Sequence, residues 1–340
     1  MKAPLSALCA AVLLCACQKD APEAARQELE KRHIVPDPGA LVIAAREGDV
    51  DRLRLLLLSG VDPGLAGPDG ETALGAALAE GRSEAVEVLV REGGNRVLEG
   101  PARAAILPPS GQTALGWALA RRQTGVVAGL LKNGTDPNKP LVTPAGPAFL
   151  QAVGDGSLDY YLRREQGVTP LMLASATGQL EAARLLLEAG ADPGAETRRH
   201  KTEAIWLAGR NQHTAVVRLL LGKDPSDQSL LVRVDLRRQR ATLYRDGNPV
   251  DSSPVSTGRP GFQTPKGSYV VTNKYRDWKS TLYEDAPMPF FMRLSCGDFG
   301  LHAGVLPGYP ASHGCIRMPY EKARAFFSKV EVGTLVEIVD

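Results

Sequence analysis

An internal repeat across residues 39–225 constrains the fold of this 340-residue chain more than any other feature. Three similar pentapeptides, GETAL, GQTAL and GVTPL, begin at Gly70, Gly111 and Gly167. Each is followed by a stretch of small residues, a polar break and a second stretch that ends in adjacent aliphatic residues. A repeated pair of short helices can bury its apolar faces only against neighbouring copies. The pattern therefore predicts an all-α solenoid of stacked helix pairs.

Alanines and glycines recur at fixed places in these copies, and each placement has a physical reason. Neighbouring pairs should approach too closely for a large side chain at the alanine positions, which are Ala44, Ala77, Ala118, Ala174 and Ala208. The second helices should end at Gly60, Gly134 and Gly190, where a left-handed backbone is expected.

The copy GVTPLMLASATGQLEAARLLLEAGADP, at residues 167–193, resembles the ankyrin repeat. Thr202 follows Thr169 by 33 residues, which is the period of that family. The spacing is longer elsewhere, because residues 96–110 are predicted to be a loop and residues 147–163 a degenerate copy. We therefore expect five recognisable repeats and a candidate sixth. The resemblance implies a face that binds a protein partner, and a structural spacer is the alternative.

The N-terminus predicts export from the cytoplasm. Residues 1–16 begin with a positive charge at Lys2 and continue with an apolar stretch too short to span a bilayer, which is typical of a secretory signal peptide. The sequence Leu-Cys-Ala-Cys that ends at Cys17 resembles the lipobox of bacterial lipoproteins, which implies lipidation of Cys17. Gln18 resembles the residue found there in lipoproteins sent to the outer membrane, so the expected location is the periplasm; an ordinary cleaved signal is the alternative. Residues 17–38 are charged, end in a Pro-rich stretch and are expected to form a tether, with a short helix as an option.

Charge and hydropathy argue against two classes of partner. The chain has 40 Lys and Arg against 38 Asp and Glu, a formal net charge of +2, and so lacks the broad basic field of a nucleic-acid-binding protein. Beyond the N-terminal segment there is no apolar run of ~20 residues, so contact with a membrane is expected only through a lipid anchor.

Residues 228–340 change to a β pattern and predict a second domain. Apolar and charged residues alternate in LLVRVDL from Leu230, and Asp246-Gly247 marks a turn after the next strand candidate. The other expected elements are strands at 268–274, 288–295, 299–302 and 334–339 and one helix at 320–329. Together they predict a mainly-β domain of viable size.

The residues that could carry out a reaction lie near the end of this domain. Ser312-His313-Gly314-Cys315 places an imidazole two residues from a thiol, and His302 lies 13 residues before Cys315. A thiol becomes a nucleophile when a neighbouring base removes its proton and a third group orients that base. The backbone N–H groups of Gly314 and Cys315 are candidates to hold the oxyanion of a tetrahedral intermediate. These residues predict acyl transfer through a Cys thioester and leave open which histidine is the base.

The motifs SHGCIR from Ser312, LHAG from Leu301, and STG with TPKG between Ser256 and Gly267 resemble the catalytic domain of the L,D-transpeptidases, the YkuD family. The resemblance implies a β-sandwich-like fold, with no cofactor and no metal. It also implies a donor, the tetrapeptide stem of peptidoglycan, whose diaminopimelate L-centre acylates the cysteine while the terminal D-Ala leaves. The acyl group then passes to an amine, which forms a 3→3 cross-link or anchors a protein.

The same resemblance assigns roles to residues of this chain. It makes Cys315 the nucleophile and His302 the base, which the backbone carbonyl of Ala303 would orient. His313 and Gly314 would shape the site. The expected substrate-binding residues are Ser312, Ala303 and Arg317.

Alternatives remain for the thiols and for the activity. Cys296, His302, His313 and Cys315 could form a zinc site, although no closely spaced ligand pair precedes them. Cys296 could pair with Cys315 as a disulfide in an oxidising compartment, or could be an inert buried thiol. The domain could instead give its thioester to water, as a carboxypeptidase or in releasing wall-linked protein, or it could bind peptidoglycan without catalysis.

Four cations of this domain are also open to two interpretations. Arg259, Lys266, Arg293 and Arg317 are either surface charges or contacts for the carboxylates of the stem. The second interpretation has a chemical basis, because the guanidinium fork suits a carboxylate.

Overall fold

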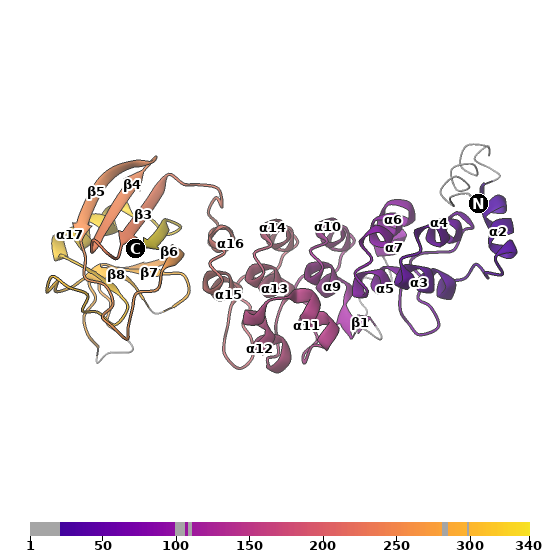
Figure 1. Ribbon diagram of the computed structural model, residues 1–340, viewed down its shortest axis with the longest axis horizontal. Coiled ribbons are helices and arrows are strands. Elements are labelled where there is room, and N and C mark those ends of the chain that lie inside the picture. Colours follow the sequence, from indigo (N-terminus) through magenta and orange to yellow (C-terminus); the bar gives the residue numbers. More distant parts are fainter. Residues whose placement is uncertain (1–20, 99–105, 108–110, 281–284, 298) are drawn as a thin grey trace, which may run out of the picture. The chain divides into compact units, whose positions relative to one another are not determined.

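The computed structural model describes residues 21–98, 106–107, 111–280, 285–297 and 299–340 (Figure 1). The predicted signal peptide at 1–16 and Cys17 lie outside these residues. The chain divides into two compact units. One holds the chain up to Leu173 with Leu185–Asp192 and Thr197–His200, and the other holds Ala174–Arg184, Pro193–Glu196 and Lys201–Asp340. None of the helices within the described ranges is both long enough and apolar enough to cross a membrane.

Helices come in pairs along residues 38–220, as the repeat predicts. The pairs are α3 (Pro38–Glu47) with α4 (Val50–Leu58), α5 (Ala73–Ala79) with α6 (Ser83–Gly93), α9 (Ala114–Ala120) with α10 (Thr124–Lys132), α11 (Pro147–Val153) with α12 (Gly156–Arg164), α13 (Pro170–Ala176) with α14 (Leu180–Glu188), and α15 (Ala204–Arg210) with α16 (Thr214–Leu220). The pair α11 and α12 occupies the stretch that was expected to be a degenerate copy.

The residues that define the repeat have the predicted environments. The five alanines at the close-packing positions are completely buried, and Gly60, Gly134 and Gly190 have φ angles of 95°, 82° and 89°. The threonine of the pentapeptide begins the first helix of a pair: the Thr72 hydroxyl accepts from the Gly75 N–H, and Thr113 does the same for Gly116. A side-chain oxygen here satisfies a backbone donor that the helix itself leaves unpaired.

Two stretches outside the helix pairs are also structured. Residues 21–31 of the predicted tether form helix α2 (Ala21–Lys31), whose Ala25 and Leu29 are completely buried. Arg26 of this helix donates to the Ser59 carbonyl over 3.0 Å, so α2 is held against the end of α4. The stretch 96–110, predicted as a loop, includes α7 (Asn95–Leu98) and strand β1 (Ile106–Leu107), which pairs with β2 (Gln112–Thr113).

Residues 230–339 form an eight-stranded sheet with the order β5-β4-β3-β10-β6-β7-β8-β9. Its strands are β3 (Leu230–Asp235), β4 (Arg240–Arg245), β5 (Asn248–Pro254), β6 (Gly267–Tyr275), β7 (Phe291–Leu294), β8 (Gly300–Ala303), β9 (Ile316–Met318) and β10 (Leu335–Val339). The pairs β3/β10 and β8/β9 are parallel and the others antiparallel.

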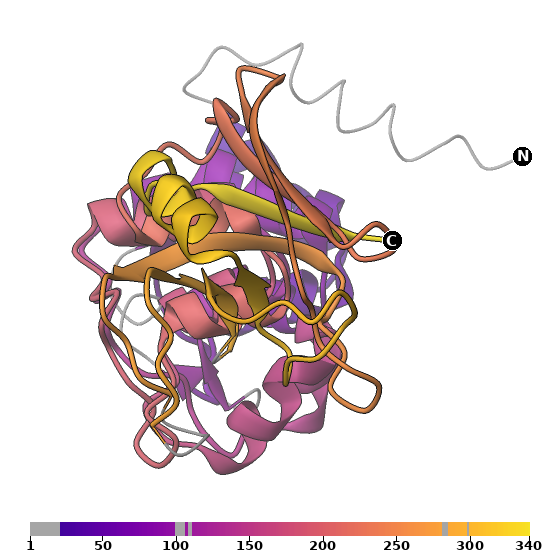
Figure 2. The same ribbon diagram turned by 90° about the vertical axis from the view of Figure 1, so that its left-hand side faces the viewer.

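Strand β6 joins the two halves of this sheet. Its first half pairs with β10 and its second half with β7, and the register shifts between Val271 and Asn273. Such an irregularity lets a sheet bend, so both halves can face one core. Helix α17 (Tyr320–Lys329) contacts β8 and β5, and in Figure 2 this yellow helix lies against the sheet. The core residues Leu243, Met292 and Phe326 come from the two halves and from α17.

Within the second unit, helix α16 is fixed to the chain around the sheet by a buried arginine. Arg218 is 5% exposed, and its Nε donates to the carbonyl of Gly333 over 2.8 Å. Its guanidinium also donates to the carbonyl of Asp227. Nearby, the backbone N–H of Ser268 donates to the side chain of Gln212.

Candidate active site

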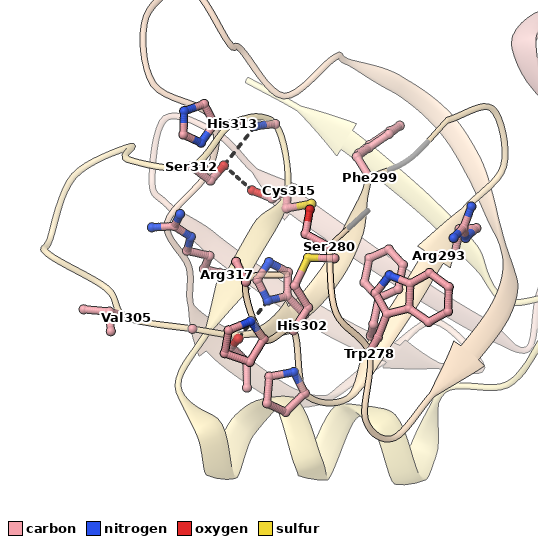
Figure 3. A pocket seen from close by; sticks show the side chains of 18 of the residues that line it. Trp278, Ser280, Arg293, Phe299, His302, Val305, Ser312, His313, Cys315 and Arg317 are labelled. Carbon is pink, nitrogen blue, oxygen red and sulfur yellow. Dashed lines mark hydrogen bonds between the residues drawn. The ribbon is translucent and has the colours of Figure 1, made fainter. Parts of the chain in front are cut away.

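Parallel pairing of β8 and β9 brings His302 and Cys315 together. His302 on β8 is in register with Arg317 on β9, and Cys315 immediately precedes β9. Both side chains line one cavity of about 950 Å³ in the second unit (Figure 3). Every site residue predicted in this domain lines the same cavity: His302, Ala303, Ser312, His313, Gly314, Cys315 and Arg317.

The His302 ring is buried and its tautomer is determined by its neighbour. Nδ1 lies 2.7 Å from the carbonyl oxygen of Ala303. A carbonyl can only accept, so Nδ1 carries the proton and the lone pair of the neutral ring is on Nε2. The resemblance predicted an interaction with this carbonyl, and the structure contains it.

Burial also determines the charge of His302. Removal from water lowers its pKa from 6.5 to about 4, because it disfavours the charged ring. The hydrogen bond to Ala303 acts in the opposite direction, and the positive charge of Arg317 lowers the pKa further. His302 is therefore neutral near pH 7 and has an Nε2 lone pair that can receive a proton.

The His313 ring has the opposite tautomer. Arg259 donates from Nη2 to Nε2 of His313 over 2.8 Å. A guanidinium has no acceptor, so Nε2 must carry the lone pair and the proton of the neutral ring is on Nδ1. Phe262 packs edge-on against this ring at 4.8 Å between centroids, and the Arg259 guanidinium lies 4.9 Å from the centre of the Phe262 ring. This arrangement engages Nε2 of His313 with an arginine, and it favours His302 as the base.

A tight turn before Cys315 is closed by the hydroxyl of Ser312. This hydroxyl donates to the carbonyl of Cys315 over 2.5 Å and accepts from the Gly314 N–H over 3.1 Å. Gly314 has a φ of 116°, a backbone conformation that residues other than glycine rarely adopt. The Gly314 N–H, a predicted oxyanion donor, therefore already donates to the Ser312 hydroxyl inside the turn. Thr264 donates to the Gly314 carbonyl over 2.8 Å and holds the turn from the other side.

The four candidate cations differ in whether they line the cavity. Lys266 pairs with Asp340 over 2.8 Å in an exposed position and does not line the cavity. Arg259 holds His313, as described above. Arg293 and Arg317 line the cavity, so these two remain candidates for contact with a bound ligand.

Sequence reasoning missed the aromatic wall of the cavity. Trp278, Phe291 and Phe299 line it, and they come from a loop, a strand and a turn that share no motif. A signal was present in the composition, since 13 of the 18 Phe, Trp and Tyr residues fall in residues 228–340.

The two cysteines of the second unit, Cys296 and Cys315, do not form a disulfide. Cys296 lies in the turn between β7 and β8, and burial raises its pKa, while the charge of Arg210 acts in the opposite direction. It is absent from the cavity lining, unlike Cys315. The described part of the chain contains no group of three or more His, Cys, Asp or Glu side chains placed to hold a metal ion.

Comparisons with known proteins agree with the two parts of the chain. Residues 229–338 match the model of the L,D-transpeptidase catalytic domain, and residues 41–140 and 149–230 match the model of ankyrin repeats. A Bacillus licheniformis protein provisionally named L,D-transpeptidase YkuD is 28% identical over 120 residues, which cover 34% of this chain and 69% of that protein.

Solved structures of L,D-transpeptidases are also similar to this chain. The enzyme from Mycobacterium smegmatis is 22% identical, with 33% of this chain and 59% of that chain covered and a TM-score of 0.31. L,D-transpeptidase 3 from Mycobacterium tuberculosis, solved with a faropenem-derived adduct, is 23% identical, with 33% and 60% covered and a TM-score of 0.31. This chain thus spans about three fifths of the length of these solved structures.

Proposed function

This chain belongs to the ankyrin-repeat proteins and carries an L,D-transpeptidase catalytic domain at residues 229–338, and on that premise we propose that it transfers acyl groups between peptidoglycan peptides through a thioester on Cys315. One observation carries the proposal. Cys315 shares a cavity with His302, and the Ala303 carbonyl holds the His302 ring as the tautomer with a basic Nε2. That is the relation between nucleophile, base and orienting group that cysteine acyl transfer requires.

The first half-reaction forms the thioester. Nε2 of His302 takes the proton of the Cys315 thiol as sulfur attacks the carbonyl at the L-centre of the donor's diaminopimelate. The C–S bond forms, the C–N bond to the terminal D-Ala breaks, and the imidazolium returns its proton to the leaving amine. Burial makes the charged ring unstable, which favours this return.

The second half-reaction transfers the acyl group to an amine. The acceptor amine attacks the thioester carbonyl, an amide bond forms, and the C–S bond breaks. The thiolate regains the proton that the attacking nitrogen loses, and the product is a cross-linked pair of stems or a protein linked to a stem. Water in place of the amine would give hydrolysis, which shares the first half-reaction.

The N-terminal part of the proposal concerns location. The lipobox-like sequence supports lipidation of Cys17 and an anchor in the outer membrane, which would place the catalytic domain in the periplasm beside its substrate. The repeats would bind a protein partner there, since stacked repeats commonly offer such surfaces.

The function can be tested with disaccharide-tetrapeptide and product analysis by mass spectrometry. Wild-type protein should form dimers that have lost one D-Ala, and Cys315→Ala should form none. Cys296→Ala is the matched control, because it removes the other cysteine of this domain and lies outside the cavity lining. Trimmed monomers alone would replace the transferase with a hydrolase, and unchanged substrate in every sample would refute catalysis on this donor.

A further inference from the structure

The chain from residue 256 to 258 runs beside the turn that carries Cys315. Its middle residue, Thr257, is buried. The carbonyl oxygen of Thr257 accepts from the backbone N–H groups of Ala311 and Ser312 over 2.9 and 3.0 Å. Ser312 in turn closes the turn with its hydroxyl, as the dashed lines in Figure 3 show. Thr257 therefore anchors the two residues from which the turn begins.

The N–H and the hydroxyl of Thr257 are bonded to the side chain of Gln239, which lies in the turn between β3 and β4. The Thr257 N–H donates to Oε1 of Gln239 over 2.9 Å, and Nε2 of Gln239 donates to the Thr257 hydroxyl over 2.7 Å. Nε2 also donates to the carbonyl of Leu236 over 2.7 Å. The orientation of the amide is determined by these partners, because a backbone N–H can only donate and a carbonyl can only accept. Gln239 thus ties Thr257 to the β3–β4 turn.

The backbone of Gln239 has a conformation that glycine adopts more easily. Its φ is 46°, which lies in the left-handed region. A residue with a side chain is uncommon there, because the conformation raises the free energy of the fold unless other contacts compensate. The three hydrogen bonds of the amide are such contacts. The backbone carbonyl of Gln239 also accepts from the Val255 N–H over 2.9 Å, but a glycine would keep that bond. The side chain is therefore the reason for a glutamine at this position.

We propose that Gln239 is a positioning residue for acyl transfer: through Thr257 it fixes the start of the turn, and so keeps the sulfur of Cys315 within reach of Nε2 of His302. The assignment rests on the proposed function, because it concerns the geometry of the same site. Gln239 does not line the cavity, so it acts only through the residues that it holds. A small displacement of a reacting group lowers the rate of its reaction steeply, even when the contacts with substrate persist.

The variant Gln239→Gly separates positioning from folding, because glycine suits a φ of 46° and only the side-chain bonds are lost. In amide hydrogen exchange on the full-length protein, the N–H groups of Ala311 and Ser312 should exchange about tenfold faster than in the wild type. The N–H of Val336, on the interior strand β10, should keep its rate. Gln228→Gly is the matched control, because Gln228 is an exposed glutamine of the same unit, and it should leave all these rates unchanged.

Turnover of the tetrapeptide donor measures the consequence for the reaction. Gln239→Gly should lower kcat about tenfold and leave KM within about twofold, because other residues make the contacts with substrate. Thr257→Val removes only the hydroxyl contact and should give a smaller loss. In the double variant Gln239→Gly/Ser312→Ala, kcat/KM should be close to that of Ser312→Ala alone, because both changes loosen one turn. Independent sites with tenfold losses would instead give about a hundredfold loss together.

Four results would overturn the assignment. They are unchanged exchange at Ala311 and Ser312 in Gln239→Gly, an equal acceleration at Val336, a wild-type kcat despite faster exchange in the turn, and multiplied losses in the double variant. The second would show a general loss of stability in place of a local one. A wild-type protein that converts no donor would refute the proposed function, whereas the exchange rates would still decide whether Gln239 holds the turn.

Discussion

Acidification should leave the first half-reaction largely intact until well below the usual titration range of histidine. The reasoning concerns His302, whose lone pair on Nε2 is required to take the thiol proton. Protonation of this ring would remove the base. Because burial lowers its pKa to about 4, protonation should occur only in strongly acidic solution.

The size of the effect follows from the two pKa values. At pH 5.5 a ring with a pKa of about 4 is roughly 3% protonated, whereas an ordinary histidine with a pKa of 6.5 would be about 90% protonated. The fraction of enzyme with a competent base therefore differs about tenfold between the two cases at this pH. The value of kcat/KM should be nearly constant between pH 5 and 7 and should fall below a pH of about 4.

The assay is the pH dependence of kcat/KM for the tetrapeptide donor, which reports the groups of the free enzyme. His302→Gln should lower kcat/KM by about 10²–10⁴-fold at pH 7, since it removes the base. Cys296→Ala should keep the wild-type profile. An acid limb with a midpoint near pH 6.5 in the wild type, with an unchanged fold, would refute the argument from burial.

Three further predictions concern groups around the site and the fold. Ser312→Ala should lower kcat/KM about tenfold, because the turn before Cys315 loses both hydrogen bonds of the hydroxyl. Ser312→Thr should recover much of the loss, and equal kcat/KM values in the wild type and both variants would contradict this prediction. Arg259→Gln should change the tautomer of His313, which its ¹⁵N chemical shifts report, while Lys266→Gln on the same segment should leave these shifts unchanged. Identical spectra for the two variants would show that Arg259 does not determine the tautomer. Arg218→Ala should lower the free energy of unfolding by about 2 kcal/mol in urea titrations, because the carbonyls of Gly333 and Asp227 lose their donor. The exposed Arg245→Ala should cost far less, and equal losses would show that the buried arginine contributes no more than an exposed one.

The helical part of the chain was predictable because its signals are local and repeated. A threonine such as Thr72 begins a helix by accepting a hydrogen bond from the backbone N–H three residues later. An alanine such as Ala118 recurs at the positions where neighbouring helix pairs pack closely, and it is buried there. Even the degenerate copy at 147–163 forms a helix pair. The sequence offered a short helix in the tether only as an option, because the two buried residues of α2, Ala25 and Leu29, are too few to distinguish a packed helix from a polar tether.

The site was predictable only where its residues lie in motifs. All seven predicted residues line one cavity, but strand β9 was missed because it has only three residues. The tautomer of His313 depends on Arg259, 54 residues earlier, and no sequence pattern links the two. The stacking of Trp278 on Arg293 likewise depends on how the loop after β6 folds over β7. The roles of these residues in catalysis remain predictions.

The neutral state of His302 has a consequence for the chemical durability of the protein. Peroxides and most alkylating agents attack a thiolate far faster than a thiol. Many cysteine enzymes hold a thiolate permanently beside a charged imidazole and are correspondingly easy to inactivate. Here the ring is uncharged at neutral pH and cannot hold the sulfur of Cys315 in such an ion pair. An enzyme built in this way would reserve the reactivity of its sulfur for the moment when a substrate carbonyl arrives, and could persist in an oxidising compartment.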